Sequence, residues 1–148
     1  ETAPFPGFPT DLQAPFTALM TIANGESKIT ETIFENRMNH IYLLNEMGAR
    51  IKLNKNVAHI KGVKTIKGMN LVGSDLRSSA ALIIAGIIAK GSSKIYGLEH
   101  LDRGYENFEL KLKNLGIKIT REVSKSTFEK NEYKIKTKSE KLSKLEAA

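Results

Sequence analysis

An internal repeat constrains the fold of this chain more than any other feature of its sequence. Four blocks match in the same order, at offsets that grow from 64 to 68 residues: 11–13 with 75–77, 25–29 with 91–95, 36–37 with 102–103, and 47–51 with 115–119. Four ordered matches are unlikely to arise by chance, and two small insertions account for the change in offset. The chain is therefore expected to contain two copies of one structural unit.

Each copy is predicted to form a helix, a strand, a second helix and a further strand. Thr10 and Gln13 form a capping-box pattern that starts a helix with Leu12, Phe16, Leu19 and Ala23 on its apolar face. Ser74 is expected to cap the matching helix of the second copy. Gly25 and Gly91 end these helices, and residues 29–34 and 94–98 follow as strands.

The second helix of each copy is predicted over residues 37–47 and 103–115. Asn36 and Asp102 would cap these helices, and Gly48 and Gly116 would end them. Their apolar faces are Ile41, Leu44 and Met47 in the first copy and Phe108, Leu112 and Leu115 in the second.

Strands follow the second helices, and a polar segment ends the chain. Residues 50–53 and 57–63 flank a turn-rich Asn-Lys-Asn link and predict a hairpin, and residues 117–123 and 133–136 could form its counterpart. Residues 121–148 are rich in lysine and are expected to be a solvated tail that can include the end of the last hairpin. Contact of this tail with nucleic acid or a membrane surface is the less favoured interpretation, because its charges are mixed.

Charge and composition narrow the possible chemistry. Among 148 residues, 23 Lys and Arg against 16 Asp and Glu give a net charge of +7, which favours anionic partners. The absence of cysteine excludes disulfides, thiolate metal sites and cysteine nucleophiles within this chain. Its three histidines lack metal-ligand spacing, its glycines fit neither phosphate-loop pattern, and no serine stands in a nucleophile motif. Neither a metal nor a cofactor is expected. The longest apolar run, residues 80–89, is shorter than the about 20 residues that a membrane span needs.

Three of the five arginines are predicted to lie in first turns of helices. They are Arg37, Arg77 and Arg103. A guanidinium beside a helix N-terminus suits a small anion such as phosphate or carboxylate. The structural alternative is pairing with nearby acids, for example Arg103 with Asp102 or Glu106. Asp11 and Asp75 occupy matching positions at helix starts, where each could stabilise the helix dipole or accept a proton from a substrate hydroxyl.

Four longer blocks carry a family resemblance: PGFPTDLQAPF (6–16), TETIFENRMNH (30–40), GSDLRSSAALIIAG (73–86) and HLDRGYENFELKLKNLG (100–116). Over residues 5–120 the chain resembles the C-terminal portion of the UDP-N-acetylglucosamine 1-carboxyvinyltransferases, which are enolpyruvyl transferases. The resemblance implies an α/β (α+β) fold, the inside-out α/β barrel built from repeated βαβαββ units, here in part. Residues 1–120 would then be the C-terminal part of the catalytic domain, with repeat units at about 5–66 and 67–120.

The same resemblance implies an activity. Family members transfer enolpyruvate from phosphoenolpyruvate to the 3-hydroxyl of UDP-N-acetylglucosamine and release phosphate, which is the first committed step of peptidoglycan synthesis in the bacterial cytoplasm. Asp11 matches the aspartate that contacts the sugar hydroxyl and is the candidate base, and Asp75 matches an aspartate linked to proton transfer at the enolpyruvyl group. Arg103 matches the arginine that grips phosphoenolpyruvate, with Arg37 and Arg77 as its cationic surroundings. Ile33 matches a position whose backbone helps to bind the nucleotide sugar, and Phe34 lies beside it.

The family's reactive cysteine loop and its N-terminal lysine–asparagine pair have no counterpart among these 148 residues. The chain is therefore expected to be a fragment that is inactive alone and needs the N-terminal portion of the enzyme as its partner. Two alternatives remain open at this point: the related 3-phosphoshikimate 1-carboxyvinyltransferase, and a non-catalytic fragment that binds nucleotide sugars. A nucleic-acid binder is a third, less favoured class.

Overall fold

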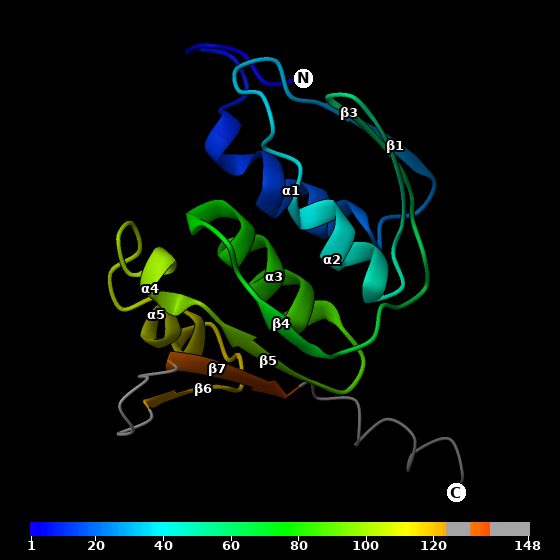
Figure 1. Cartoon of the computed structure of the whole chain (residues 1–148). Helices are drawn as coiled ribbons and strands as arrows, with labels where there is room; N and C mark the ends of the chain where they lie inside the picture. Colours follow the sequence, from blue (N-terminus) through cyan, green and yellow to red (C-terminus); the bar gives the residue numbers. More distant parts are fainter. Residues whose placement is uncertain (124–130, 137–148) are drawn as a thin grey trace, which may run out of the picture.

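Three helices, α1 (Gln13–Met20), α2 (His40–Glu46) and α3 (Leu76–Ile88), occupy the interior of the molecule, and two sheets lie outside them (Figure 1). The computed structural model describes residues 1–123 and 131–136. Helices α1, α2 and α3 lie between the two sheets, and α1 packs along α3. This arrangement, with helices inside and sheets outside, confirms the expected inside-out α/β class for a partial unit.

The first sheet is entirely antiparallel. Its strands run in the order β1 (Glu26–Thr30), β3 (Val57–Lys61) and β2 (Arg50–Asn54). Ile29, Ala58 and Ile60 are buried, whereas the alternate residues of these strands are mostly exposed. The predicted hairpin between residues 50 and 63 is confirmed.

The second sheet repeats this order and adds one strand. It runs β4 (Asn70–Val72), β5 (Ser92–Tyr96), β7 (Asn131–Lys136) and β6 (Ile119–Val123), with β4 parallel to β5 and the other pairs antiparallel. β5, β7 and β6 therefore correspond to β1, β3 and β2. The N–H of Thr2 donates to the carbonyl of Thr30. In the second copy the N–H of Gly73 donates to the carbonyl of Tyr96, which lies 66 positions after Thr30. The two predicted copies thus share one strand order.

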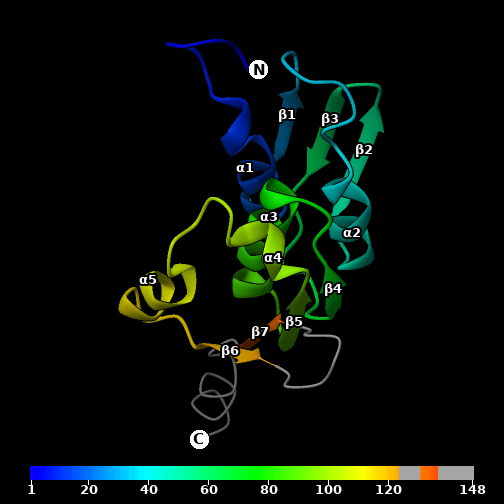
Figure 2. The same cartoon turned by 60° about the vertical axis from the view of Figure 1, so that its left-hand side comes forward.

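The described residues contain six helical segments: η1, a 3₁₀ turn (Thr10–Leu12), α1 (Gln13–Met20), α2 (His40–Glu46), α3 (Leu76–Ile88), α4 (Leu98–Leu101) and α5 (Phe108–Asn114). Most of α3 is buried, which explains why its sequence is apolar on all sides. Figure 2 shows that α5 stands away from α2 and leads into β6. The glycines expected to end helices, Gly25, Gly48, Gly91 and Gly116, all have positive φ, as predicted.

The predicted apolar face of the first helix is wrong. Leu12, Phe16 and Leu19 are between 42% and 49% exposed, while Ala14 and Ala18 are buried. α1 lies against α3 on its small residues, because these allow the two backbones to approach closely. The predicted cap at Thr10 is also absent, since the Thr10 hydroxyl donates to Glu31 instead.

The second helices begin later than predicted. Asn36 adopts a left-handed conformation and α2 starts only at His40. In the second copy Asp102 ends α4 and Asn107, also left-handed, precedes α5. The predicted caps at Asn36 and Asp102 are therefore wrong, and neither Arg37 nor Arg103 lies in a helical first turn. The faces differ too: Ile41, Leu44 and Met47 are buried, but Leu115 is 78% exposed.

The predicted pairing of residues 117–123 with 133–136 is confirmed, because β6 and β7 are antiparallel neighbours, whereas the expectation of a solvated tail from Arg121 onward is wrong for β7. This strand lies between β5 and β6, and Tyr133 and Ile135 are buried in it. The rest of the predicted tail, residues 124–130 and 137–148, lies outside the described residues. Within residues 1–123 and 131–136, no helix is long and apolar enough to cross a membrane.

Candidate substrate-binding site

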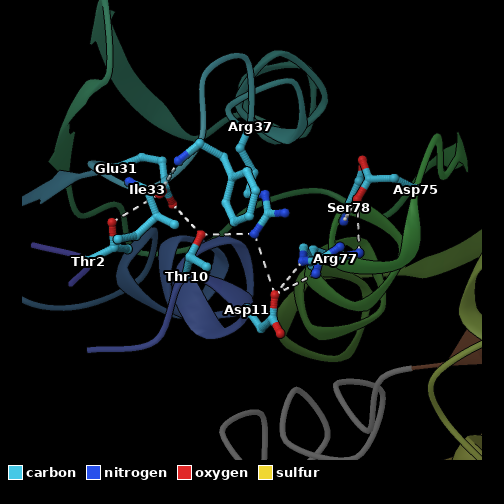
Figure 3. A network of polar contacts seen from close by, with 10 residues as sticks. Thr2, Thr10, Asp11, Glu31, Ile33, Arg37, Asp75, Arg77 and Ser78 are labelled. Atoms are coloured by element: carbon cyan, nitrogen blue, oxygen red, sulfur yellow. Dashed lines mark hydrogen bonds and ion pairs between the residues drawn. The ribbon is translucent and has the colours of Figure 1, made fainter. Parts of the chain in front are cut away.

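Asp11 lies where the two copies meet, and arginines from both copies contact it (Figure 3). Nη1 of Arg37 is 3.4 Å from Oδ1 of Asp11, and both Nε and Nη2 of Arg77 are 2.6 Å from the same oxygen. The Asp11 side chain is 65% exposed. Its Oδ2 has no hydrogen-bond partner among the described residues, so this oxygen is available to a ligand.

The 3₁₀ turn explains why Asp11 is free to act in this way. The N–H of Leu12 donates to the carbonyl of Pro9, so the backbone itself closes the start of the helix. No side-chain cap is made there. The Asp11 carboxylate therefore points into the space between the copies rather than back onto its own helix.

Asp75 has the opposite role at the matching position. Its Oδ1 accepts hydrogen bonds from the backbone N–H groups of Arg77 and Ser78, at 2.9 and 3.0 Å. Asp75 is thus the N-cap of α3, the place predicted for Ser74. This cap starts α3 one residue before Arg77, so the Arg77 side chain lies in the first turn of a buried helix. Of Arg37, Arg77 and Arg103, only Arg77 lies at a helix N-terminus as predicted.

Two clefts share the loop that follows β1. The larger has a volume of about 540 Å³ and is lined by Ile33, Phe34, Arg37 and Asn56, among others. The smaller, of about 280 Å³, also contacts Asp75 and Arg77. The Arg37 guanidinium lies 3.8 Å from the centre of the Phe34 ring, a cation–π contact. The loop thus supplies both an aromatic surface and a cation to the two clefts.

Glu31 and Thr10 support this loop from inside the protein, and neither role was predicted from the sequence. Glu31 is 2% exposed, and its carboxylate accepts hydrogen bonds from Thr2, Thr10 and the N–H groups of Ile33 and Phe34. Burial alone would raise the pKa of Glu31, but these hydrogen bonds together lower it below its ordinary value. The signal was available in the sequence, because Glu31 shares the inward face of its segment with Ile29, two residues earlier.

Arg103 is not part of this cluster. It is exposed in the loop between α4 and α5, and it forms no hydrogen bond or ion pair with the part of the chain that the structure describes. Gly104 nevertheless packs on Leu76, where a β-carbon would lie 2.9 Å from the leucine side chain. The Arg103 loop therefore lies beside the N-terminus of α3. The neighbour expected to pair with Arg103, Asp102, binds Arg121 instead, with its two oxygens 3.0 and 2.5 Å from the guanidinium nitrogens.

His40 is the remaining buried titratable group close to the site. It is 2% exposed, and its Nε2 has no hydrogen-bond partner among the described residues. Burial lowers the pKa of His40 to about 4, against the opposing attraction of Asp75. Over residues 1–123 and 131–136, no group of histidine and acidic side chains could hold a metal ion.

Comparison with known proteins decides the family. A sequence model of EPSP synthase (3-phosphoshikimate 1-carboxyvinyltransferase) matches residues 1–112. The chain belongs to the EPSP synthase family. This family of enolpyruvyl transferases is the one to which the four sequence blocks pointed.

Relatives within the family share a more specific name. The chain is 90% identical, over all of its 148 residues, to a UDP-N-acetylglucosamine 1-carboxyvinyltransferase of Prochlorococcus marinus strain AS9601, and it covers 32% of that protein. It is 54% identical over 121 residues to the enzyme of that name from Synechocystis sp. strain ATCC 27184, covering 82% of this chain and 28% of that protein. The chain thus spans about a third of the length of the curated relatives it matches.

Solved structures agree on the enolpyruvyl transferase fold. The enolpyruvyl transferase NikO from Streptomyces tendae matches with a TM-score of 0.70 at 24% identity, over 92% of this chain and 29% of that one. EPSP synthase from Acinetobacter baumannii matches with a TM-score of 0.65 at 15% identity, over 87% and 29% of the two chains. At these identities the likeness concerns the fold alone.

Proposed function

We propose that this chain provides part of the active site of a UDP-N-acetylglucosamine 1-carboxyvinyltransferase. Such an enzyme transfers enolpyruvate from phosphoenolpyruvate to the 3-hydroxyl of UDP-N-acetylglucosamine and releases phosphate, the first committed step of cytoplasmic peptidoglycan synthesis. The observation that carries the proposal is the Asp11 carboxylate, bound through one oxygen by Arg37 and Arg77 and open through the other. Close relatives with this name add support.

Asp11 is the proposed base. When the sugar oxygen bonds to the enolpyruvyl carbon, the 3-hydroxyl must lose its proton, and Oδ2 of Asp11 is the free acceptor beside Arg37 and Arg77, which line the smaller cleft. Arg37 and Arg77 fix the orientation of the carboxylate through Oδ1. A carboxylate that is already held in one orientation loses less conformational entropy on reaching the transition state than a mobile one does.

The other proposed site residues are assigned roles that fit the place of each residue in the fold. The backbone of Ile33 and the ring of Phe34 line the larger cleft, where the nucleotide sugar would bind. Arg103 would grip the phosphoenolpyruvate anion, with Arg77 and Arg37 adding positive charge. Asp75 would serve proton transfer at the enolpyruvyl group through Oδ2, since its Oδ1 is used to cap α3. No cofactor is required in this scheme.

A chimeric enzyme tests the proposal. In it, the 148-residue chain replaces the matching segment of the Prochlorococcus marinus AS9601 relative, and phosphate release is measured from phosphoenolpyruvate plus UDP-N-acetylglucosamine. We expect turnover by the chimera and none by the chain alone, because the substrates need groups from the rest of the enzyme.

Two control measurements separate the alternatives. Shikimate 3-phosphate replaces the nucleotide sugar in one, and turnover with it alone would favour the 3-phosphoshikimate enzyme. Calorimetric titration of the isolated chain with UDP-N-acetylglucosamine is the other. A folded chimera without turnover, together with binding by the chain, would reduce the proposal to a non-catalytic nucleotide-sugar-binding fragment.

A further inference from the structure

A buried carboxylate, Glu31, lies in the wall of the larger cleft and is hydrogen-bonded to the 3₁₀ turn as well as to the loop after β1. Oε1 of Glu31 accepts from the N–H groups of Ile33 and Phe34, at 2.8 and 3.1 Å, and from the Thr2 hydroxyl at 3.0 Å. Oε2 accepts from the Thr10 hydroxyl at 2.7 Å. The described residues place no cation against it, so four N–H and O–H donors compensate its charge. One side chain thereby connects the N-terminal segment, the 3₁₀ turn and the loop after β1.

The hydrogen at Thr10 has only one possible direction. Nη1 of Arg37 donates to the Thr10 oxygen at 2.9 Å, so that oxygen acts as an acceptor toward the arginine. The single hydroxyl hydrogen of Thr10 is then directed to Glu31. The Thr10 hydroxyl therefore bridges the Glu31 carboxylate and the Arg37 guanidinium. The same Nη1 of Arg37 also contacts Asp11.

We propose that Glu31 is a positioning residue, which holds the Ile33–Phe34 backbone in the larger cleft and, through Thr10, aligns Arg37 with Asp11. The first connection rests on two backbone hydrogen bonds, and the second on the fixed direction of the Thr10 hydroxyl. Assignment of these two connections to nucleotide-sugar binding and to the base rests on the proposed function. Glu31 itself touches no substrate in this scheme.

The geometry requires a carboxylate rather than any polar side chain. All of its described partners donate hydrogen to Glu31. A glutamine has one acceptor oxygen and one NH₂ group, so an NH₂ must face either Thr10 or the two backbone N–H groups. In the first case Thr10 loses its acceptor and its hydrogen turns elsewhere. In the second case two N–H groups remain unpaired in a buried position, which is costly.

Glu31→Gln, with Glu26→Gln as its matched control, tests the first connection. Glu26 is an exposed residue at the start of β1, the strand that ends directly before Glu31, and it lies outside both clefts. Amide hydrogen exchange of Ile33 and Phe34 is measured in the chain and in the chimera. We expect exchange to accelerate by about tenfold or more in Glu31→Gln and to stay unchanged in Glu26→Gln, since bonds to charged acceptors are among the stronger ones.

Kinetics of the chimera then separate positioning from a merely structural role. We expect Glu31→Gln to raise KM for UDP-N-acetylglucosamine by about tenfold, with a smaller fall in kcat, because the Ile33 backbone binds and Asp11 reacts. A variant with lower stability but an unchanged KM and unchanged Ile33 and Phe34 exchange would overturn the proposal.

Thr10 tests the second connection separately. Thr10→Val removes the hydroxyl and should lower kcat by about tenfold without accelerating exchange at Ile33 and Phe34. Thr10→Ser keeps the hydroxyl and should restore kcat. Equal kcat in the valine and serine variants would refute the connection through Arg37, and this comparison still decides if Glu31→Gln fails to fold.

Failure of the proposed function gives a different pattern. A folded chimera with native Glu31 that neither binds nor converts UDP-N-acetylglucosamine contradicts the proposed function. The exchange measurement on Ile33 and Phe34 decides the positioning role of Glu31 even in that case.

Discussion

The two copies share one strand order but use their matching aspartates differently. Asp75 caps the long, buried helix α3, while Asp11 sits on a 3₁₀ turn and contacts Arg37 and Arg77. A buried helix must have its first N–H groups satisfied by a partner, and Asp75 supplies one. The first copy closes its turn with the Pro9 carbonyl instead. A repeated fold can thus keep its framework while one of two equivalent residues makes contacts outside its own helix.

Charge burial also differs between the copies. The 66-residue offset that aligns Asn36 with Asp102 also aligns His40 of the first copy with Glu106 of the second. His40 and Glu31 are buried, whereas Glu106 is exposed. Folding therefore depresses the pKa of both Glu31 and His40 in the first copy, and their charge state is coupled to folding.

Replacement of the first aspartate should have the largest effect. We expect Asp11→Asn in the chimera to lower turnover by about 10² to 10⁴-fold, the usual contribution of a general base. Its melting temperature should hardly change, because the Asp11 side chain is largely exposed and such ion pairs contribute little to stability. Phosphate release and thermal unfolding measure the two quantities. Turnover within threefold of the parent would remove Asp11 from the role of base.

Acid should destabilise the first copy through His40. Because burial depresses the pKa of His40 in the folded chain, the unfolded chain binds the proton first. The stabilisation is complete above about pH 6.5 and is lost as pH falls toward 4, by about 3 kcal/mol in total.

Urea unfolding at several pH values checks this effect. His40→Gln should remove this part of the slope, while His59→Gln, a change at an exposed histidine of β3, should keep it. Equal slopes in His40→Gln and the parent would show that His40 does not titrate on unfolding. The stabilisation from Glu31, whose pKa is also depressed, is present above the ordinary pKa of a carboxyl group and is lost only as pH falls below it.

The smallest expected effect concerns Asp75, which caps α3 and is also proposed to serve proton transfer. We expect Asp75→Ala to cost about 1 kcal/mol of folding free energy, as a lost N-cap usually does, while Asp75→Asn keeps the cap. Chemical denaturation measures the stability and phosphate release by the chimera measures the chemistry. If Asp75 also serves proton transfer, the asparagine variant stays stable but loses turnover. Full activity of a stable Asp75→Asn variant would leave Asp75 with the cap alone.

Local signals predicted the framework well. Gly48 and Gly116, with positive φ, directly follow the C-caps of α2 and α5 as expected, and the Asn-Lys-Asn link marked the first hairpin. Such features depend on a few neighbouring residues, which is why the sequence alone reveals them. The β4 strand was missed because it is only three residues long and lies beside a strand distant in sequence.

Features that depend on distant partners were predicted less well. The exposed face of α1 was misjudged because contact with α3 selects small side chains, which no periodicity within α1 reveals. Arg37 and Arg77 do meet at the site, yet only Arg77 does so from a helix start. The role of Glu31 depends on donors at residues 2, 10, 33 and 34, and local patterns do not bring these together.

The contact between Arg77 and Asp11 joins an arginine of the second copy to a carboxylate of the first. Neither copy contains the complete pair, so the site exists only while α1 and α3 remain docked. A small opening between these helices would separate the two charges before any strand lost its neighbours. The orientation of the proposed base therefore depends on the packing of α1 against α3. A change that weakens this packing, even far from the clefts, would weaken the proposed catalysis before it unfolded the protein.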